Sequence, residues 1–293
     1  MAISASQVKE LRETTGLGMM ECKQALVEAN GDKEAAIELL RKKAGAKVEK
    51  KAARTAADGA VGIALSADKK TVAMVEINSE TDFVAKGDEF LAFTANVAET
   101  VVASRPADVD ALQNETIANG STTVSKGLEA LIAKLGEKMS VRRFVIQQSH
   151  GNIGTYIHGR KIGVVVDMEG GSEDLAKDIA MHIAASRPEY ISKDQVPADV
   201  VEKEKEIFSA QAMESGKPAD IVEKMVLGRI NKYLAEITLL GQPFVKNPDV
   251  TVEKLLKDAS AKVVAFYRYE VGEGIEKKQD DFAAEVMAQV QGN

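Results

Sequence analysis

Residues 79–87 (SETDFVAKG) place an aromatic ring and a carboxylate in a connection between an expected strand and an expected helix. Phe83 stands there among polar residues, and connections often carry binding groups because they lie at the surface. These residue types suit contact with another molecule. The alternative is a core anchor, which the spacing favours because Phe90 follows seven residues later.

Two adjacent methionines, Met19 and Met20, follow Gly18 at the start of an expected helix. Neighbouring helical residues point in different directions, so at most one of the two is expected to face the core. Methionine is flexible and polarizable, and an exposed methionine is typical of a protein contact. The pair therefore indicates a second candidate contact.

Glycine-rich stretches fail as phosphate-binding loops. Gly216-Lys217 is followed by Pro218, which lacks both the hydroxyl and the backbone N–H that a phosphate loop supplies. The stretches 16–18 and 272–274 lack the third glycine of a dinucleotide motif. We interpret all three as turns.

Titratable side chains do not form a catalytic group. Asp178 and His182 are one helical turn apart and could pair, but a surface or subdomain contact is favoured over acid–base chemistry. His158 is interpreted as a turn histidine, with a partner contact as the alternative. Cys22, beside Lys23, is the single cysteine, which excludes an intrachain disulfide and gives only weak support for a reactive thiol. This pattern favours a binding or regulatory protein over an enzyme.

Composition narrows the class further. The chain has 293 residues, enough for about two domains, and a formal net charge of -7. An acidic chain is a poor general binder of nucleic acid or of anionic membranes, because each phosphate contact needs a cation. The N-terminus is polar, and no apolar run approaches the ~20 residues that cross a bilayer. We expect a soluble cytoplasmic protein without nucleic-acid or membrane contacts.

The first 45 residues predict three short helices that carry the methionine pair. Ser4 and Gln7 fit a capping box, and residues 16–18 break the first helix. The second helix is expected over residues 19–29 and the third from the cap at Asp32 to Gly45. A basic stretch follows to residue 54, interpreted as a helical or semi-rigid linker rather than an RNA-binding arm, since no aromatic residues are interleaved.

A change to alternating apolar residues near Ala60 predicts strands, with a second strand over Val72–Ile77. A helix with Phe93, Val97 and Val101 on one face should then end at Ser104-Arg105-Pro106. A similar unit returns 82 residues later, with a helical stripe that ends at Ser186-Arg187-Pro188. We interpret the two as a duplicated α+β subdomain.

The later part of the chain predicts a helical hairpin, a strand and a last helix. The hairpin spans residues 199–234 with its turn at residues 216–218, the strand spans Val263–Val271, and the helix spans Asp281–Val290. The apolar stripe of the hairpin fits a partner surface or ordinary packing equally well. Phe282 in the last helix is interpreted as packing.

The sequence resembles the bacterial elongation factor Ts family over essentially its whole length. The motifs that carry the resemblance are Val8–Arg12, Thr15–Met20, Ala57–Gly59, Thr81–Lys86, Arg142-Arg143, His158-Gly159, Ile162–Val164, Met181-His182, Ala184–Ser186, Gly241–Phe244 and Glu270–Gly274. The resemblance implies an α+β fold with two related subdomains that contain antiparallel sheets. It implies these parts: residues 1–55, a ubiquitin-associated-like (UBA-like) three-helix domain with its basic linker; 56–145, core subdomain N; 146–198 and 236–275, core subdomain C; 199–235, a helical hairpin of dimerisation type inserted in subdomain C; and 276–293, a C-terminal helical module.

The resemblance also implies a function. Members of the family bind elongation factor Tu in its GDP form and expel GDP, as exchange factors without catalytic residues or a cofactor of their own. The residues implied to dislocate Mg²⁺ from elongation factor Tu are Thr81, Asp82, Phe83 and Val84. Those implied to contact the partner elsewhere are Arg12, Met19, Met20, Lys23, Leu135, Gly136 and His158. Leu135 replaces the usual isoleucine, a conservative departure.

Two rival functions remain. A polypeptide- or ubiquitin-like-binding adaptor needs only the N-terminal helices, and would bind through residues 1–55 alone. A small-molecule enzyme would need a catalytic group, for which the sequence offers no residues.

Overall fold

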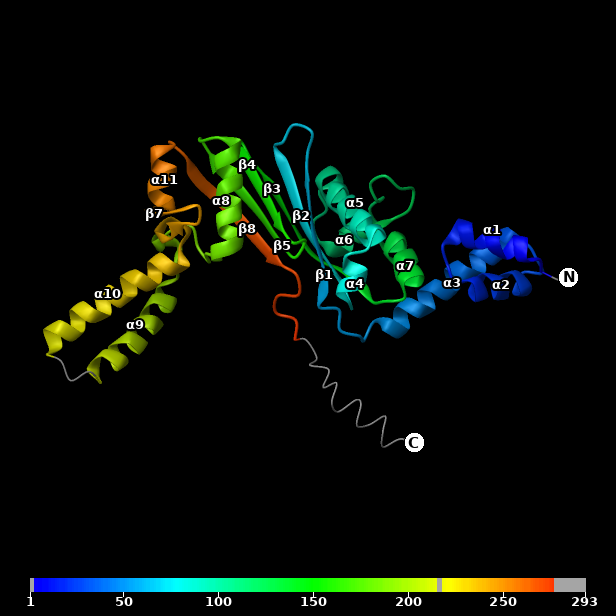
Figure 1. The fold of residues 1–293 in the computed structure, drawn as a ribbon, viewed down its shortest axis with the longest axis horizontal. Coiled ribbons are helices and arrows are strands. Elements are labelled where there is room, and N and C mark those ends of the chain that lie inside the picture. Colours follow the sequence, from blue (N-terminus) through cyan, green and yellow to red (C-terminus); the bar gives the residue numbers. More distant parts are fainter. Residues whose placement is uncertain (1–2, 215–217, 277–293) are drawn as a thin grey trace. The chain divides into compact units, whose positions relative to one another are not determined.

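The computed structural model describes residues 3–214 and 218–276 (Figure 1). The expected last helix with Phe282 lies outside the described residues, as do Gly216 and Lys217 of the expected hairpin turn. The described residues divide into two compact units. The first holds residues 3–62, 75–144 and 271–276, and the second holds residues 63–74, 145–214 and 218–270.

Three helices begin the chain: α1 (Ala5–Thr15), α2 (Met19–Glu28) and α3 (Lys33–Lys51). The predicted capping box is present, because the Ser4 hydroxyl accepts from the Gln7 N–H while the Gln7 side chain accepts from the Ser4 N–H. α1 ends at Gly16 in the left-handed region, at φ 68°. Leu11, Leu26 and Leu40, one from each helix, are buried in a small shared core.

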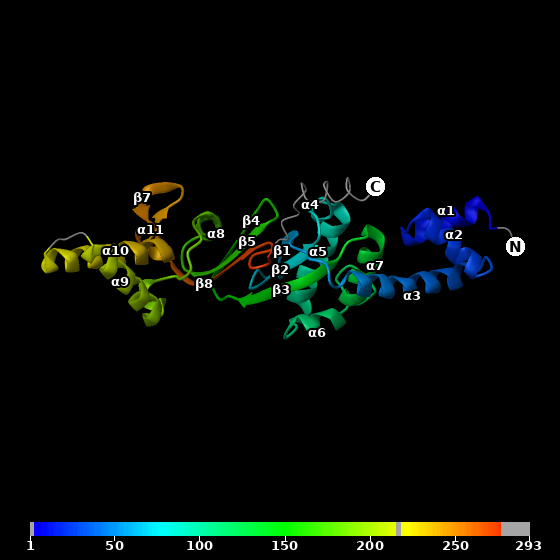
Figure 2. The same cartoon turned by 90° about the horizontal axis from the view of Figure 1, so that it is seen from below.

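Helix α3 is longer than the sequence predicts. We expected it to end at Gly45, but it continues to Lys51 (Figure 2). The surrounding alanines and lysines are good helix formers, and one exposed glycine costs only about 1 kcal/mol relative to alanine. The basic stretch is therefore mostly helical, as one of the two linker interpretations proposed.

A three-stranded sheet follows, in the order β1 (Asp58–Leu65), β2 (Thr71–Ser79) and β3 (Met139–Gln148). Every residue of the central strand β2 is buried. β1 and β2 match the prediction, whereas β3 was not expected. Consecutive charged residues, Arg142 and Arg143, interrupt the alternation that would have marked β3 as a strand.

Four helices accompany this sheet in the chain: α4 (Asp82–Ala85), α5 (Asp88–Ser104), α6 (Val109–Asn114) and α7 (Val124–Leu135). The predicted stripe of Phe93, Val97 and Val101 is buried on α5. The single-turn helix α4 lies within the stretch that we treated as a connection, and α6 and α7 were not predicted. A helix as short as α4 shows no periodicity that a sequence pattern could reveal.

The second unit contains an antiparallel sheet in the order β4 (Asn152–His158), β5 (Ile162–Glu169) and β8 (Lys262–Glu270). Helix α8 (Glu173–Ser186) packs against β4 and β5. It approaches β4 so closely that a Cβ at Gly154 would lie 2.1 Å from the Ala176 carbonyl oxygen. Val164, Ile179 and Ile183 are buried in the core between sheet and helix.

The repeated terminator has the same backbone geometry in both units. Arg105 ends α5 at φ 51° and ψ 55°, and Arg187 ends α8 at φ 48° and ψ 52°. Each arginine N–H donates to a carbonyl of the preceding turn. A left-handed residue followed by proline is a strong helix stop, so the matching sequences stop two helices in the same way.

Helices α9 (Ala198–Met213) and α10 (Ala219–Ile237) pack side by side as a hairpin (Figures 1 and 2). Between them, the rings of Phe208 and Tyr233 meet edge to face at 6.4 Å. The smaller elements of this unit are η1 (Lys193–Gln195), η2 (Leu239–Gly241), β6 (Pro243–Phe244), β7 (Asn247–Thr251) and α11 (Val252–Asp258). Among the described helices, none has the length and apolar character needed to span a membrane.

Candidate functional site

The ring of Phe83 stands on the surface. Its exposed fraction is 86%, whereas Phe90, seven residues later, is completely buried. The interpretation of Phe83 as a core anchor, which the spacing favoured, is therefore wrong. Phe90 fills the core position, and the intervening glycine at position 87 separates α4 from α5 so that the two rings do not share a helical face.

The turn that carries Phe83 is ordered by its neighbours. Thr81 caps α4, and its hydroxyl accepts from the Val84 N–H. The Ser79 hydroxyl donates to the Thr81 carbonyl at 3.0 Å. Within the helix, Lys86 forms an ion pair with Asp82 at 2.5 Å. Phe83 thus projects from a fixed single turn rather than from an open loop.

A glutamate from the α7–β3 connection holds the cap itself. Glu137 accepts the Thr81 N–H at 3.0 Å with one oxygen and the Thr81 hydroxyl at 2.6 Å with the other. In return, Glu80 accepts the Lys138 N–H at 2.6 Å. The sequence analysis missed these contacts, because the partners are 56 and 58 residues apart and no local pattern links them.

The same connection contains Leu135 and Gly136. Leu135 is the last residue of α7 and is half-buried, and Gly136 caps that helix at φ 81°. The Lys51 ammonium, at the end of α3, donates to the Gly136 carbonyl. Since Glu137 follows directly, the structure brings Leu135 and Gly136 together with the Thr81–Val84 turn.

The methionine pair lies at the first turn of α2, after the N-cap Gly18. Met19 is 59% exposed and Met20 is 73% exposed, so neither faces the core, although we had allowed one of them to do so. Lys23 is exposed one turn later on the same helix. Val27, 56% exposed, extends the line and was missed, although its spacing of four from Lys23 was a usable signal.

Arg12, the fourth predicted contact in the N-terminal helices, is exposed on α1. Cys22, by contrast, is fully buried, with its sulfur 3.6 Å from the Thr15 hydroxyl oxygen. Burial removes the access that a reactive thiol needs. The four contacts predicted in the N-terminal helices, two methionines and two basic side chains, are therefore all exposed to solvent, whereas the thiol is not accessible.

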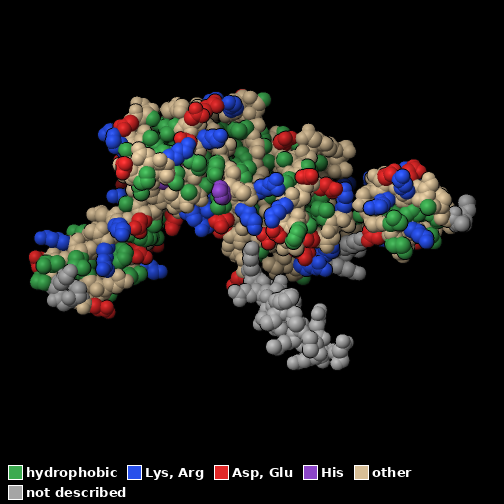
Figure 3. Space-filling model, in the orientation of Figure 1, with side chains coloured by type: hydrophobic (Ala, Val, Ile, Leu, Met, Phe, Trp, Pro, Cys, Tyr) green, Lys and Arg blue, Asp and Glu red, His purple; other side chains and the backbone are tan. Residues whose placement is uncertain are grey.

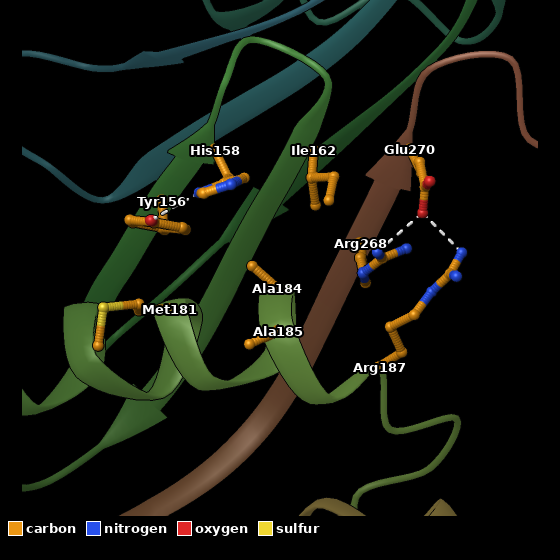
Figure 4. Close-up of a pocket in the computed structure, with 9 residues that line it drawn as sticks. All are labelled: Tyr156, His158, Ile162, Met181, Ala184, Ala185, Arg187, Arg268 and Glu270. Carbon is orange, nitrogen blue, oxygen red and sulfur yellow. Dashed lines mark hydrogen bonds and ion pairs between the residues drawn. The ribbon is translucent and has the colours of Figure 1, made fainter. Parts of the chain in front are cut away.

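His158 belongs to the second unit, at the end of β4, and is exposed. It lines a cavity of about 390 Å³ (Figure 4). Its Nδ1 lies 3.1 Å from the Tyr156 hydroxyl, and the two rings stack. On the opposite wall, Arg268 and Arg187 both bind the Glu270 carboxylate (Figure 4). The hydrogen bond from Arg268, followed by the charge of Arg187, lowers the pKa of Glu270.

Asp178 and His182 do not pair. Asp178 binds Lys246 at 2.5 Å, whereas His182 is fully buried and lies 2.9 Å from the Gln242 side-chain oxygen. The Val245 N–H donates to His182 Nδ1. His182 is thus a core histidine, and both residues contact residues 242–246 rather than each other, in line with the surface or subdomain contact that we favoured over acid–base chemistry.

Figure 3 shows basic, acidic and apolar side chains interspersed over the visible face of the molecule. Among the described residues, no cluster of three or more His, Cys, Asp or Glu side chains is arranged to hold a metal ion. The candidate contacts consist of an exposed ring beside a half-buried carboxylate on a braced turn, and of exposed methionines at a helix start. An exposed aromatic anchor on a rigid element is typical of a contact with another protein.

Together, the mixed helix and sheet architecture with small antiparallel sheets and these exposed side chains are typical of a protein that docks on another macromolecule. The family model described as Elongation factor TS matches residues 80–273. This chain belongs to the elongation factor Ts family, the nucleotide exchange factors for elongation factor Tu in translation elongation.

Curated relatives agree over the full length. The chain is 60% identical to "Elongation factor Ts" of Thioalkalivibrio sulfidiphilus over 294 residues, which cover 100% of each chain. It is 57% identical to "Elongation factor Ts" of Alkalilimnicola ehrlichii, again with 100% of each covered. It is 54% identical to "Elongation factor Ts" of Legionella pneumophila (strain Paris), with 98% of each covered. The relatives thus extend the match to the N-terminal helices, which the family model leaves out.

Proposed function

We propose that this chain binds elongation factor Tu in its GDP form and speeds GDP release by inserting the Thr81–Val84 turn beside the Mg²⁺ and phosphate site. The observation that carries this proposal is the 86% exposure of Phe83 on a turn whose cap is held from outside. A buried ring would have no access to a partner. GTP then enters the emptied pocket and the exchange factor leaves.

The physical basis is a wedge with an acidic neighbour. A GTPase holds GDP through its phosphate loop and a Mg²⁺ that bridges phosphate oxygens, side chains and water. Burial of an exposed phenylalanine ring contributes roughly 1.5–3 kcal/mol, which can displace side chains of the partner. The Asp82 carboxylate, one residue earlier on the same turn, disturbs the water and ligand network of the ion.

Nucleotide exchange depends on a coupling free energy between two ligands of elongation factor Tu. This chain lowers the affinity of elongation factor Tu for GDP, and GDP lowers its affinity for this chain by the same factor. A ~10⁴-fold effect needs about 5.5 kcal/mol, more than one ring supplies. The proposed docking contacts must therefore hold the chain in place while the turn acts. In the N-terminal helices these contacts are Arg12, Met19, Met20 and Lys23. Elsewhere they are Leu135, Gly136 and His158.

The proposed division of labour separates docking from release. Met19 and Met20 present flexible apolar side chains, and the nearby cations Arg12 and Lys23 suit an acidic partner surface.

The chain needs no cofactor for this action, which transfers no chemical group. Its net charge of -7 does not favour direct nucleic-acid binding, and translation elongation places its action in the cytoplasm.

The hairpin of α9 and α10 is proposed as a dimerisation surface. Four apolar side chains along it are exposed: Ile207, Met213, Ile221 and Leu227. A groove of about 490 Å³ runs between the helices near Met213 and Val226. Light scattering of the full chain and of a variant in which the hairpin is replaced by a short loop tests this proposal. A full chain at twice its monomer mass and a variant at its own monomer mass support the proposal, whereas the same oligomeric state for both contradicts it.

The central experiment is release of a fluorescent GDP from elongation factor Tu, followed by stopped flow. Phe83→Ala should slow release strongly at saturating concentration while docking affinity changes little. Val264→Ala is the matched control, because it shortens an exposed apolar side chain on β8 outside the proposed contacts. Release at wild-type speed with F83A would mean that the ring is not the wedge.

A further inference from the structure

Glu137 and Glu80 cross-link two segments that are far apart in the chain. Each carboxylate accepts a backbone N–H of the other segment, from Thr81 and from Lys138 respectively. We refer to Glu80, Thr81, Glu137 and Lys138 as the carboxylate clamp. We propose that Glu137, through this clamp, is a positioning residue for nucleotide exchange that holds the Phe83 turn in its working orientation; this inference rests on the proposed function.

The hydrogen bonds form a chain that ends at the wedge. Glu137 binds both donors of Thr81, its N–H and its hydroxyl. Because the Thr81 hydroxyl donates its hydrogen bond to Glu137, its oxygen lone pairs face the Val84 N–H and accept from it. Thr81 and Val84 flank Asp82 and Phe83 on either side. The carboxylate therefore fixes the cap, and the cap fixes the direction in which the ring points.

Helix α4 cannot hold this geometry alone. It has four residues, and a single helical turn is unstable in isolation because nucleation costs more than its few hydrogen bonds return. Only Ala85 of this helix is buried. A turn that deforms when it meets the partner displaces fewer of the partner's side chains. A contact that holds the turn rigid therefore increases the coupling free energy between this chain and GDP. Glu137 supplies that brace.

The clamp is itself anchored on the side of Glu80 and Lys138. The Lys138 ammonium donates to the Ala52 and Arg54 carbonyls at 2.7 Å each. Arg54 completes the arrangement with an ion pair to Glu80 at 3.3 Å. The clamp therefore joins the wedge turn to the residues that follow α3.

The clamp also unites two groups of proposed contacts. Gly136 immediately precedes Glu137, and its backbone direction is fixed by the left-handed cap of α7. Any movement of Glu137 would displace Leu135–Gly136 and the Phe83 turn together. We infer that these residues meet elongation factor Tu as one rigid surface rather than as two independent loops.

The test uses the full chain and separates maximal GDP release from docking. Glu137→Ala should reduce the maximal release rate at saturation about tenfold, equivalent to about 1.4 kcal/mol, and leave the half-saturating concentration within about threefold. A purely structural loss would instead reduce the active fraction, which raises the apparent half-saturating concentration and lowers the melting temperature. Glu129→Ala is the matched control, since the side chain of Glu129 on α7 makes no hydrogen bond or ion pair to the residues that the structure describes.

Three further variants examine the route of the effect. Glu137→Gln retains one acceptor oxygen and should recover part of the rate. Thr81→Val keeps the shape of the side chain but removes the hydroxyl, and Thr81→Ser restores it. If Glu137 acts through Thr81, E137A should cost less in the T81V background than in wild type. Additive losses would mean that Glu137 acts elsewhere, such as directly on the partner.

The outcomes distinguish this inference from the proposed function. Slow release with F83A but wild-type maximal release with E137A overturns the positioning role and leaves the wedge intact. Wild-type release with F83A overturns the wedge and the positioning role with it. Should E137A fail to fold, T81V carries the test, because it keeps the bond from the Thr81 N–H to Glu137 and removes the bonds of the hydroxyl to Glu137 and to the Val84 N–H, so a smaller loss in the same parameter is expected.

Discussion

Arg143 donates from Nε to the carboxylate of Glu76 at 2.6 Å, and Glu76 has no exposed surface. The same carboxylate accepts from Arg142 at 3.0 Å and from the Gly272 N–H at 2.9 Å. Asn78 supplies a further donor. Within the first unit, strand β2 thus holds a buried charge that ties Arg142 and Arg143 of β3 to the residues after β8.

Loss of this charge should destabilise the first unit. Glu76→Gln keeps the shape of the side chain but removes the counter-charge of Arg142 and leaves Arg143 with its ion pair to Glu273. Removal of one partner of a buried pair costs ~3–5 kcal/mol, and the partly exposed arginines place the expected loss near about 3 kcal/mol. Urea unfolding at pH 7 measures it. Glu129→Gln serves as the control, and an unchanged midpoint for E76Q would contradict a stabilising role.

Low pH should remove the contribution of the Glu76 carboxylate to the free energy of unfolding. Burial alone would raise the pKa of Glu76, but the Gly272 N–H, Arg142, Arg143 and Asn78 outweigh burial and lower the pKa below 4.5. Stability from such a carboxylate is complete above pH 4.5 and is lost as the pH falls through the folded-state pKa. The difference in unfolding free energy between wild type and E76Q should therefore shrink only below pH 4.5. A constant difference would exclude this linkage.

His182 should produce a second pH dependence at higher pH. Because the Val245 N–H donates to Nδ1, the proton sits on Nε2 and points at Gln242, so the ring is neutral. Burial lowers the pKa of His182 below 6.5, and the unfolded chain takes up its proton first. Stability should fall as the pH drops from above 6.5. His182→Gln should remove this slope and His158→Gln should retain it; equal slopes in wild type and H182Q would contradict the assignment.

The sequence predicted elements whose evidence is local. The Ser4 capping box, the α5 stripe and both Ser-Arg-Pro terminators depend on residues within a few positions of one another, and each is present. Strand β3 escaped prediction because its charged residues are stabilised by Glu76, 66 and 67 residues away. A charge that looks solvent-exposed in the sequence is here paired in the interior.

The candidate site shows the same limit. The family resemblance implied Thr81–Val84 as the acting turn, whereas the spacing of Phe83 and Phe90 predicted a core position for both rings. Which ring is buried depends on the break at Gly87, which changes the helical phase between them. Glu137 was invisible for a different reason, since its contact with Thr81 spans 56 residues. Long-range hydrogen bonds need the folded chain to become apparent.

Met20→Ala should weaken docking on elongation factor Tu without lowering the maximal rate of GDP release. Met20 is exposed at the start of α2, and truncation removes apolar surface that a partner would bury. We expect the dissociation constant for elongation factor Tu to rise about tenfold, with an unchanged maximal GDP release rate. Titration and saturation kinetics measure the two quantities. An unchanged dissociation constant would remove the methionine pair from the contact surface.

Val27→Ala extends this test along the helix. Val27 is exposed in line with Lys23 and was not among the residues implied by the resemblance. If the contact surface runs along α2, V27A should weaken docking less than M20A but in the same direction. An affinity equal to wild type would exclude Val27 and end the contact surface on α2 at Lys23.

Asp82→Asn should slow GDP release in a way that depends on Mg²⁺. The substitution preserves shape, and Asp82 and Lys86 are both substantially exposed, so loss of their ion pair should cost no more than about 1 kcal/mol of stability. If the carboxylate disturbs the metal's water and ligand network, its effect requires the metal. D82N should therefore lag behind wild type in millimolar Mg²⁺ and approach it when EDTA removes the ion.

Phe83→Ala provides the comparison for that experiment. A ring that displaces side chains of the partner retains part of its effect without Mg²⁺, because its work does not depend on the ion. F83A should thus stay slower than wild type in EDTA, whereas D82N should not. If the two variants respond identically to removal of Mg²⁺, the carboxylate and the ring do not have the separate roles proposed for them, and the turn acts as a single steric element.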